Sequence, residues 1–239
     1  MAMRGWRAWS VLAAVGIALL LVAAGSTWVW RSRVAVDSGM RLLAHGEPAA
    51  AARALLPVVT TQPANPRAHY YLGLAYARLG AGEGAINQLH EAVRLDPGDP
   101  RFHAGLGEAY RAAGDLSKAE AELERAVGAG GREPRYEVRL GGVLLDEGRP
   151  AGAVEHLRRA AELAPSVPEI HLALAEGLRA AGDRAGMREE YQAAERLAGD
   201  GVLGEVVRQA RPDTEPLARE CGGAPASAAG LGPAASIRE

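Results

Sequence analysis

Residues 66–167 repeat one pattern three times at an interval of 34 residues, and this feature limits the possible folds of the chain most strongly. Leu-Gly pairs recur at Leu72-Gly73, Leu106-Gly107 and Leu140-Gly141, each followed by a turn glycine, at Gly80, Gly114 and Gly148. Alanines follow at Ala85, Ala119 and Ala153, and leucines at Leu89, Leu123 and Leu157. A period between about 20 and 50 residues is typical of a stacked array of one supersecondary unit. The sequence therefore predicts a repeat array.

Each unit has the pattern of two helices joined by a glycine turn. Prolines open the three units at Pro66, Pro100 and Pro134. Proline suits the first helical position because its missing N–H would be unpaired there in any case. Asn65 and Asp99 precede two of these prolines and are good helix N-caps. The second half of each unit carries apolar residues at helical spacing, so the unit is predicted to be a helical hairpin.

Glycine recurs in the middle of the first helix, at Gly73, Gly107 and Gly141. Each such glycine costs about 1 kcal/mol of helix stability relative to alanine. Because all three glycines occupy the same position of the repeat in spite of this cost, they indicate that the two helices of a hairpin approach closely there. We expect the facing residues to be the small side chains of the second helix, Ala85, Ala119 and Ala153.

The Leu-Gly pairs, the tyrosines Tyr76 and Tyr110, the turn glycines, the paired alanines and the closing prolines Pro97 and Pro165 resemble the tetratricopeptide repeat (TPR). The resemblance extends over roughly 170 of the 239 residues. It implies an all-α solenoid, a right-handed superhelix of helical hairpins whose first helices line a concave groove. Such grooves bind partner proteins, often as extended peptides.

The repeat register extends in both directions. The predicted units are a degenerate first repeat at 32–65 and full repeats at 66–99, 100–133, 134–167 and 168–201. Pro57 lies late in the second helix of the first unit and is expected to shorten or kink it. A capping helix is predicted within 202–220, because the last unit of a solenoid exposes an apolar face. Residues 221–239 are rich in Gly, Ala, Pro and Ser and predict a disordered tail.

Residues 8–30 predict a single membrane-spanning helix after a short basic tail, 1–7. As a helix, an uncharged stretch of this length reaches ~34 Å, enough to cross a hydrocarbon core of ~30 Å. The chain's four tryptophans flank the stretch at Trp6, Trp9, Trp28 and Trp30, as interfacial belts do. The rival interpretation is a cleaved signal peptide ending near Val22-Ala23-Ala24.

Arginines lie on both sides of the predicted span, at Arg4 and Arg7 before it and at Arg31 and Arg33 after it. The two flanks carry equal numbers of arginines, so only the positive charge of the free N-terminus and the negative charge of Asp37 make the N-terminal flank more positive, the side expected to stay inside. We expect the N-terminal tail to stay inside and the bulk of the chain to be exported. In a bacterium, this is a single-pass inner-membrane protein with its bulk in the periplasm.

Composition and motifs argue against several classes of function. A net charge of −2 gives no general attraction to nucleic acid or to an acidic partner. The single cysteine, Cys221, excludes an internal disulfide, a CxxC redox site and a thiolate zinc cluster. The sequence contains no nucleophile elbow, phosphate loop or HExxH motif, and its glycine-rich stretch at 80–84 follows a predicted helix instead of a strand. We expect neither an enzyme nor a cofactor.

Three histidines, His69, His103 and His171, share the fourth position of their units and suggest a ladder of metal ligands. Equivalent residues of stacked hairpins lie ~8–10 Å apart, the usual distance between packed helices. Zinc needs ligand atoms within ~2.1 Å of the metal. We therefore interpret these histidines as packing residues inside their own hairpins and predict no metal site.

The TPR resemblance assigns partner contacts to certain positions of each first helix. The predicted groove residues are Arg67, Tyr70, Tyr71, Leu74, Arg78, Arg101, Glu108, Arg111, Arg135, Arg139 and Arg179. Arginine offers forked donors to carboxylates and tyrosine offers flat contact area, so an extended, partly acidic segment or a C-terminal carboxylate would fit. Alternatively, the arginines are solvated or pair with acids such as Asp99 and Glu133 between units. The Lys-and-Asn clamp of TPRs that bind chaperone tails is absent, because Tyr70 and Leu74 occupy matching positions.

The sequence as a whole predicts a non-catalytic, membrane-anchored scaffold or assembly factor that holds a partner protein. Proteins of similar build include TPR subunits of cytochrome c maturation, translocon-associated periplasmic factors and pilus assembly proteins. A different class stays open: a structural subunit of a stable membrane complex that uses its convex face or its anchor helix. The partner and the oligomeric state do not follow from the sequence.

Overall fold

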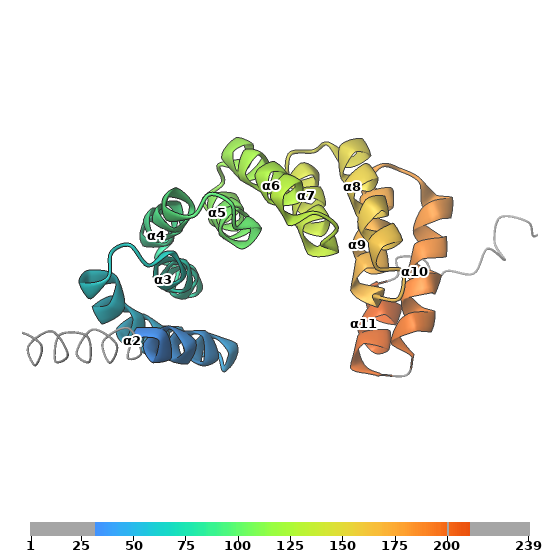
Figure 1. The fold of residues 1–239 in the computed structure, drawn as a ribbon. Helices are drawn as coiled ribbons and strands as arrows, with labels where there is room; N and C mark the ends of the chain where they lie inside the picture. Colours follow the sequence, from blue (N-terminus) through green and yellow to red (C-terminus); the bar gives the residue numbers. More distant parts are fainter. Residues whose placement is uncertain (1–31, 200, 211–239) are drawn as a thin grey trace, which may run out of the picture.

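The computed structural model describes residues 32–199 and 201–210. Its elements there are all helical and form a curved stack of hairpins (Figure 1). The predicted anchor at 8–30, the end of the predicted cap beyond residue 210 and the tail at 221–239 lie outside the described residues. Among the helices within the described ranges, none combines the length and the apolar character that a membrane crossing requires.

The hairpins follow one another along the chain. The first consists of a helix at 32–44 and α2 (Pro48–Thr61). The next four are α3 (Pro66–Arg78) with α4 (Gly82–Leu95), α5 (Pro100–Ala112) with α6 (Leu116–Gly130), α7 (Pro134–Asp146) with α8 (Pro150–Leu163), and α9 (Pro168–Ala180) with α10 (Arg184–Ala198). The last helix is α11 (Val202–Ala210). The predicted all-α solenoid of helical hairpins is confirmed.

The stack bends into an arc, and its two layers have different neighbours (Figure 1). Helices α3, α5, α7 and α9 lie on the inside of the arc, and α4, α6, α8 and α10 lie on the outside. Each outer helix also packs against the inner helix of the next hairpin, so adjacent hairpins share a continuous interface. The inner helices therefore present one concave face.

Local sequence signals explain where the helices begin and end. The Asn65 side chain accepts a hydrogen bond from the Ala68 N–H at 3.1 Å, and Asp99 accepts one from the Arg101 N–H at 2.9 Å. Both residues act as the predicted N-caps. The turns within the hairpins contain glycine with positive φ, for example 75° at Gly80 and 82° at Gly114. This left-handed conformation strains other residues, so glycine ends the first helix cleanly.

The mid-helix glycines are contact points, but their partner is not the one that we expected. A Cβ at Gly107 would lie 2.8 Å from Leu123 Cγ and 3.2 Å from the carbonyl oxygen of Ala119. Gly73 meets Leu89 and Gly141 meets Leu157 in the same way. The facing side chain is thus the buried leucine, and the alanine contributes its backbone carbonyl in two of the three hairpins. Alanine is small enough to bring that backbone close, which explains why both residues recur.

The first hairpin repeats this contact, and the last hairpin fills the same positions with different residues. Gly39, in the helix at 32–44, meets Leu55 just as the later glycines meet their leucines. In the last hairpin Ala175 replaces the glycine, and Met187 and Tyr191 replace the alanine and the leucine. All three are buried, so the side chains fill this hairpin in spite of the exchange.

Pro57 lies inside α2 without shortening it. The helix continues to Thr61 and has 14 residues, as many as α4 and α8, which contradicts the predicted shortening. At the other end of the arc, α11 packs on α10, and Val207 joins the buried cluster that contains Tyr191 and Ala194. Val202, at the start of this helix, is 86% exposed.

Replacing Gly107 by alanine tests the close contact. The change gains about 1 kcal/mol of helix propensity. The new methyl group clashes with buried Leu123 and a backbone carbonyl, and such overpacking typically costs about 1–3 kcal/mol. We expect a net loss of stability in urea unfolding followed by circular dichroism. Gly128→Ala is the matched control on α6, because nothing lies within 4 Å of its new methyl group and its stability should rise. Equal effects of the two changes would contradict the contact.

Candidate partner-binding surface

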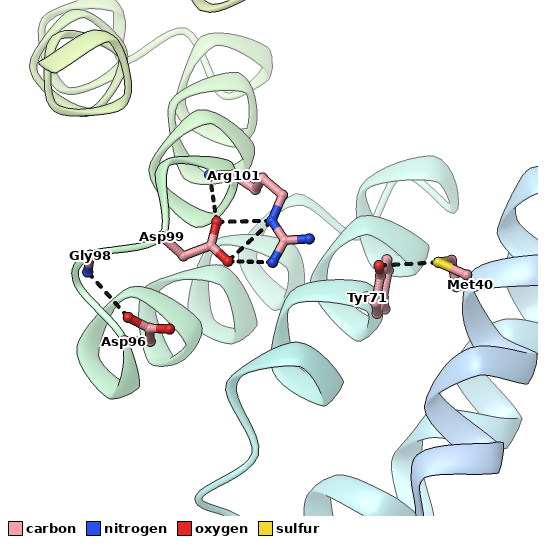
Figure 2. Close-up of polar contacts among 6 residues, drawn as sticks. All are labelled: Met40, Tyr71, Asp96, Gly98, Asp99 and Arg101. Atoms are coloured by element: carbon pink, nitrogen blue, oxygen red, sulfur yellow. Dashed lines mark hydrogen bonds and ion pairs between the residues drawn. The ribbon is translucent and has the colours of Figure 1, made fainter. Parts of the chain in front are cut away.

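At the N-terminal end of the concave face, side-chain contacts connect the first two inner helices. The Arg67 guanidinium lies 3.4 Å from an oxygen of Asp37. The Tyr71 hydroxyl donates a hydrogen bond to Met40 Sδ at 3.2 Å, as Figure 2 shows. Arg78 donates to the backbone carbonyl of Leu43. The predicted groove residues Arg67, Tyr71 and Arg78 therefore all contact the first hairpin.

Two of these contact residues, Asp37 and Met40, were missing from the predicted groove. Asp37 lies 34 residues before Tyr71, and Met40 lies 34 residues before Leu74. The repeat phase alone would have identified them. Their unit was hard to interpret from the sequence because its Leu-Gly pair is absent.

An aromatic cluster lies next to this end of the face. The Tyr70 ring centroid is 5.2 Å from that of Tyr71 and 5.1 Å from that of Phe102. Gly105 makes room for Tyr70, because a Cβ there would lie 2.9 Å from the Tyr70 ring. Burial raises the pKa of Tyr70, and the nearby Arg139 partly opposes the shift. Within the described residues no protein group bonds to the Tyr70 hydroxyl, so this polar atom is available to a partner.

Leu74, by contrast, has mainly a structural role. It is half-buried and packs against two apolar clusters, one around Leu43 and Ala75 and the other around Leu89 and Leu106. Its side chain thus helps to join the first three hairpins. Only part of it remains for a ligand.

Arg101 and Arg135 are held by acidic residues at the starts of their own helices. Figure 2 shows the Arg101 guanidinium against the Asp99 carboxylate, with Arg101 Nε 2.9 Å from Asp99 Oδ1. This hydrogen bond is the main reason why the pKa of Arg101 is raised. Arg135 pairs with Glu133 at 3.1 Å. Each acid is the last residue of one repeat and pairs with the second residue of the next, so the alternative interpretation, pairing with Asp99 and Glu133 between units, is confirmed for these two arginines.

Each of these arginines also lies over an aromatic ring. The guanidinium carbon of Arg101 is 5.8 Å from the Phe102 ring centroid, and that of Arg135 is 5.3 Å from the Tyr136 centroid. The two helix starts enclose an open pocket of about 640 Å³, lined by both arginines and by Asp96, Asp99 and Glu133. Its charges are mixed, so it has no clear preference for an anion or a cation.

The middle of the concave face carries a linked set of charges. Arg111 Nε lies 2.5 Å from Asp146 Oδ2 on the next inner helix, and this bond raises the pKa of Arg111. Glu108 lies 4.0 Å from both Arg111 and Arg139. Gly142 lets Arg111 lie close to α7, because a Cβ there would be 3.2 Å from an Arg111 nitrogen.

Arg179, at the C-terminal end of the face, pairs within its own helix. Its Nε donates to Glu176 at 2.8 Å, and the buried Tyr191 donates to the other oxygen of the same carboxylate. Glu176 is thereby fixed between the inner and the outer helix. The cross-helix bond at this end thus links the inner helix to the outer helix of one hairpin, whereas Arg67 and Arg111 link neighbouring inner helices.

The ion pairs of the concave face are exposed to solvent. A pair of this kind typically contributes only about 0–1 kcal/mol to stability. A carboxylate from a partner can therefore replace Asp146 or Glu133 beside an arginine at little cost. The face can bind flat apolar groups at Tyr70 and Tyr71, and carboxylates farther along.

The three aligned histidines are hydrogen-bonded inside their hairpins. Their Nδ1 atoms lie 2.7–2.8 Å from side-chain oxygens of the outer helix, and their Nε2 atoms lie 2.9–3.0 Å from the carbonyl oxygens of the closing prolines. The pairs are His69 with Gln88 and Pro63, His103 with Glu122 and Pro97, and His171 with Glu190 and Pro165. The predicted packing role is confirmed. Among the described residues no group of three or more His, Cys, Asp or Glu is placed to hold a metal ion.

The third full repeat contains the same pair with its members exchanged. Glu137 occupies the histidine position, and His156 on α8 lies 2.7 Å from its carboxylate. Among the described residues Glu137 makes no hydrogen bond to the preceding carbonyl, unlike the histidines at this position. Of the four loops that precede the later hairpins, only the loop before α7 carries a glycine, Gly131 with a φ of 63°, where the others carry Pro63, Pro97 and Pro165. The exchange therefore coincides with a different path of the loop before α7.

Comparisons with known proteins agree with this geometry. Sequence models of the tetratricopeptide repeat match residues 36–100, 79–137 and 134–177, which together span more than half of the chain. The chain belongs to the tetratricopeptide repeat family. None of the curated proteins that were compared matches this TPR chain.

Solved structures show the same fold. A thermophilic TPR protein of Thermus thermophilus, TTC0263, is 24% identical, covers 74% of this chain and 97% of its own, and has a TM-score of 0.63. PilF of Pseudomonas aeruginosa is 20% identical, covers 75% and 83%, and has a TM-score of 0.65. YrrB, described as a TPR protein with an unusual peptide-binding site, is 16% identical, covers 73% and 90%, and has a TM-score of 0.57. At these identities the likeness concerns the fold, which is that of protein–protein interaction scaffolds.

Exchanging His103 and Glu122 tests the role of the histidine pair. The double variant His103→Glu, Glu122→His keeps the side-chain pair but leaves the Pro97 carbonyl without a donor. We expect a loss of about 0.5–1.5 kcal/mol in urea unfolding, the usual contribution of one hydrogen bond. Glu122→Gln is the control, because it copies the natural His69–Gln88 pair and should cost less. A double variant as stable as the parent would show that the proline carbonyl does not matter.

Proposed function

We propose that this TPR chain is a membrane-anchored scaffold that binds an extended segment of a partner protein on its concave face. The observation that carries the proposal is the half-buried cluster of Tyr70 and Tyr71 beside Met40, with exchangeable arginine pairs farther along the same face. The partner segment would place an apolar side chain on the tyrosines and carboxylates beside Arg139 and Arg111. The TPR fold supports protein binding in general.

The anchor in this proposal is the uncharged stretch at 8–30, framed by tryptophans. It would hold the chain in the inner membrane of a bacterium as a single-pass protein, with the repeats on the periplasmic side. In that position the scaffold would hold its partner near the membrane, as an assembly factor does. The role needs no catalytic group and no cofactor.

Photo-crosslinking tests the concave face as the binding surface. A benzophenone amino acid replaces Tyr71 in the full-length chain in its own membrane, and the matched control carries it at His90, which is exposed on the outer helix α4. We expect a discrete protein adduct from position 71, lost on adding Arg111→Gln and Arg139→Gln, and none from position 90. Adducts from position 90 alone would support the structural-subunit alternative.

A topology reporter tests the proposed location. Alkaline phosphatase, which is active only after export, is fused to the C-terminus of the full chain. We expect an active, membrane-bound fusion, because the basic tail at 1–7 stays inside. Activity in the soluble periplasmic fraction would indicate cleavage after residue 24 instead, and an inactive fusion would contradict export.

A further inference from the structure

At the N-terminal end of the solenoid, no hairpin within the described residues covers the apolar stacking surface. The third residue of each first helix is buried in the later hairpins: Ala68 is 0% exposed, Phe102 1%, Tyr136 4% and Ile170 7%. Ala68 belongs to the cluster that includes Val58 of the preceding hairpin. The equivalent residue of the first hairpin, Val34, is 41% exposed. Terminal units of solenoids usually carry a polar outer face, so an apolar one needs an explanation.

A pocket opens at the same end. Ala35 and Ala54 occupy the positions where the four later hairpins carry their histidine pairs. These small residues, with Ser32, Pro57, Val58 and others, line a pocket of about 380 Å³. The first hairpin has thus exchanged a polar, hydrogen-bonded filling for a mostly apolar recess.

The outer face of α2 is also more apolar than the outer faces of the next three outer helices. At one pair of repeat positions α2 carries Leu56 and Pro57, where the next three outer helices carry His90-Glu91, Glu124-Arg125 and Arg158-Arg159. Leu56 is 48% exposed. The hydroxyls of Thr60 and Thr61 donate hydrogen bonds to the Pro57 carbonyl at 3.0 and 2.7 Å. Because these donors are already satisfied within the helix, they depend less on hydrogen bonds to water. Arg53 is the only charged residue of α2.

The charges around this end are mainly basic. Arg33, Arg41 and Arg53 are exposed, whereas Asp37 pairs with Arg67 on the concave face. Glu47 is the other acidic residue of the hairpin. An apolar surface with a basic fringe suits the headgroup region of a membrane with anionic lipids.

The position of the predicted anchor decides between possible occupants. Ser32 lines the pocket, and the predicted span ends at residue 30. Two residues of extended chain reach at most about 7 Å. We propose that the uncovered end, formed by Val34, Ala35, Ala54, Leu56 and Pro57, rests on the lipid headgroup region beside the anchor. This inference depends on the proposed membrane anchor.

The contact would fix how the solenoid stands on the membrane. Met40 lies on the inner helix of the same first hairpin and receives the hydrogen bond of Tyr71. The aromatic end of the concave face is therefore the end nearest the lipid. A partner segment bound there would be captured close to the membrane surface.

Spin labels on the full chain test this contact. With Cys221→Ser as background, a nitroxide is attached at Leu56→Cys or at Glu124→Cys, which has the same repeat position on α6. Both proteins are reconstituted in vesicles of phosphatidylethanolamine and phosphatidylglycerol. Power saturation then compares collisions with oxygen, which concentrates in lipid, and with a water-soluble nickel chelate. We expect a clear shift of the ratio toward oxygen at position 56 and none at position 124. A label at Pro57→Cys should repeat the result.

The outcomes separate the inference from the proposed function. A chain that does not float with the vesicles overturns the anchor and the lipid contact together. Flotation with equal ratios at positions 56 and 124 leaves the anchor and overturns the contact. Low access of both reagents at position 56 means that protein covers the surface, either residues 1–31 or a second copy, and this also overturns the lipid contact.

Discussion

The structure depends on one contact that each of the first four hairpins repeats: a leucine of the outer helix against a glycine of the inner helix. Leu123 would lie within 2.8 Å of any side chain at Gly107, so only glycine lets the helices come this close. The contact occurs with Gly39, Gly73, Gly107 and Gly141, and it gives these hairpins the same close approach. Because the hairpins are alike, their inner helices present equivalent positions at regular intervals along the arc. The concave face is a consequence of this regular packing.

Hydrogen-bonded pairs join three of the described hairpins to the loops before them. The histidine at the fourth position binds the outer helix and the preceding carbonyl at once, as His103 does with Glu122 and Pro97. Where glutamate takes that position, at Glu137, proline gives way to Gly131. The side-chain pair and the loop therefore change together. A polar group in such a site needs a partner for every donor and acceptor, which couples residues that lie far apart in the repeat.

The two ends of the concave face offer different chemistry. Near the first hairpin, Tyr70 and Tyr71 form an amphipathic surface, and the central arginines pair across helices with Asp146 and Glu108. Near the last hairpin, Arg179 and Glu176 satisfy each other within one helix. The first hairpin also differs on its outside, where Leu56 and Pro57 stand in place of charged residues. Its sequence thus departs from the repeat where contact with lipid is proposed.

The sequence by itself determined the helical hairpins, the N-caps Asn65 and Asp99, the turn glycines and the packing role of the histidines. These features depend on local spacing and backbone chemistry, and the 34-residue period makes both visible in the sequence. Only the tertiary structure decided that the Leu89 side chain meets Gly73, with Ala85 contributing only its backbone carbonyl. It also decided that Arg101 is paired with Asp99 instead of solvated, and that Asp37 and Met40 belong to the concave face. It also showed that α2 continues past Pro57. These outcomes depend on how side chains from different helices meet, because rotamers, curvature and burial choose among partners that the repeat pattern alone leaves equivalent.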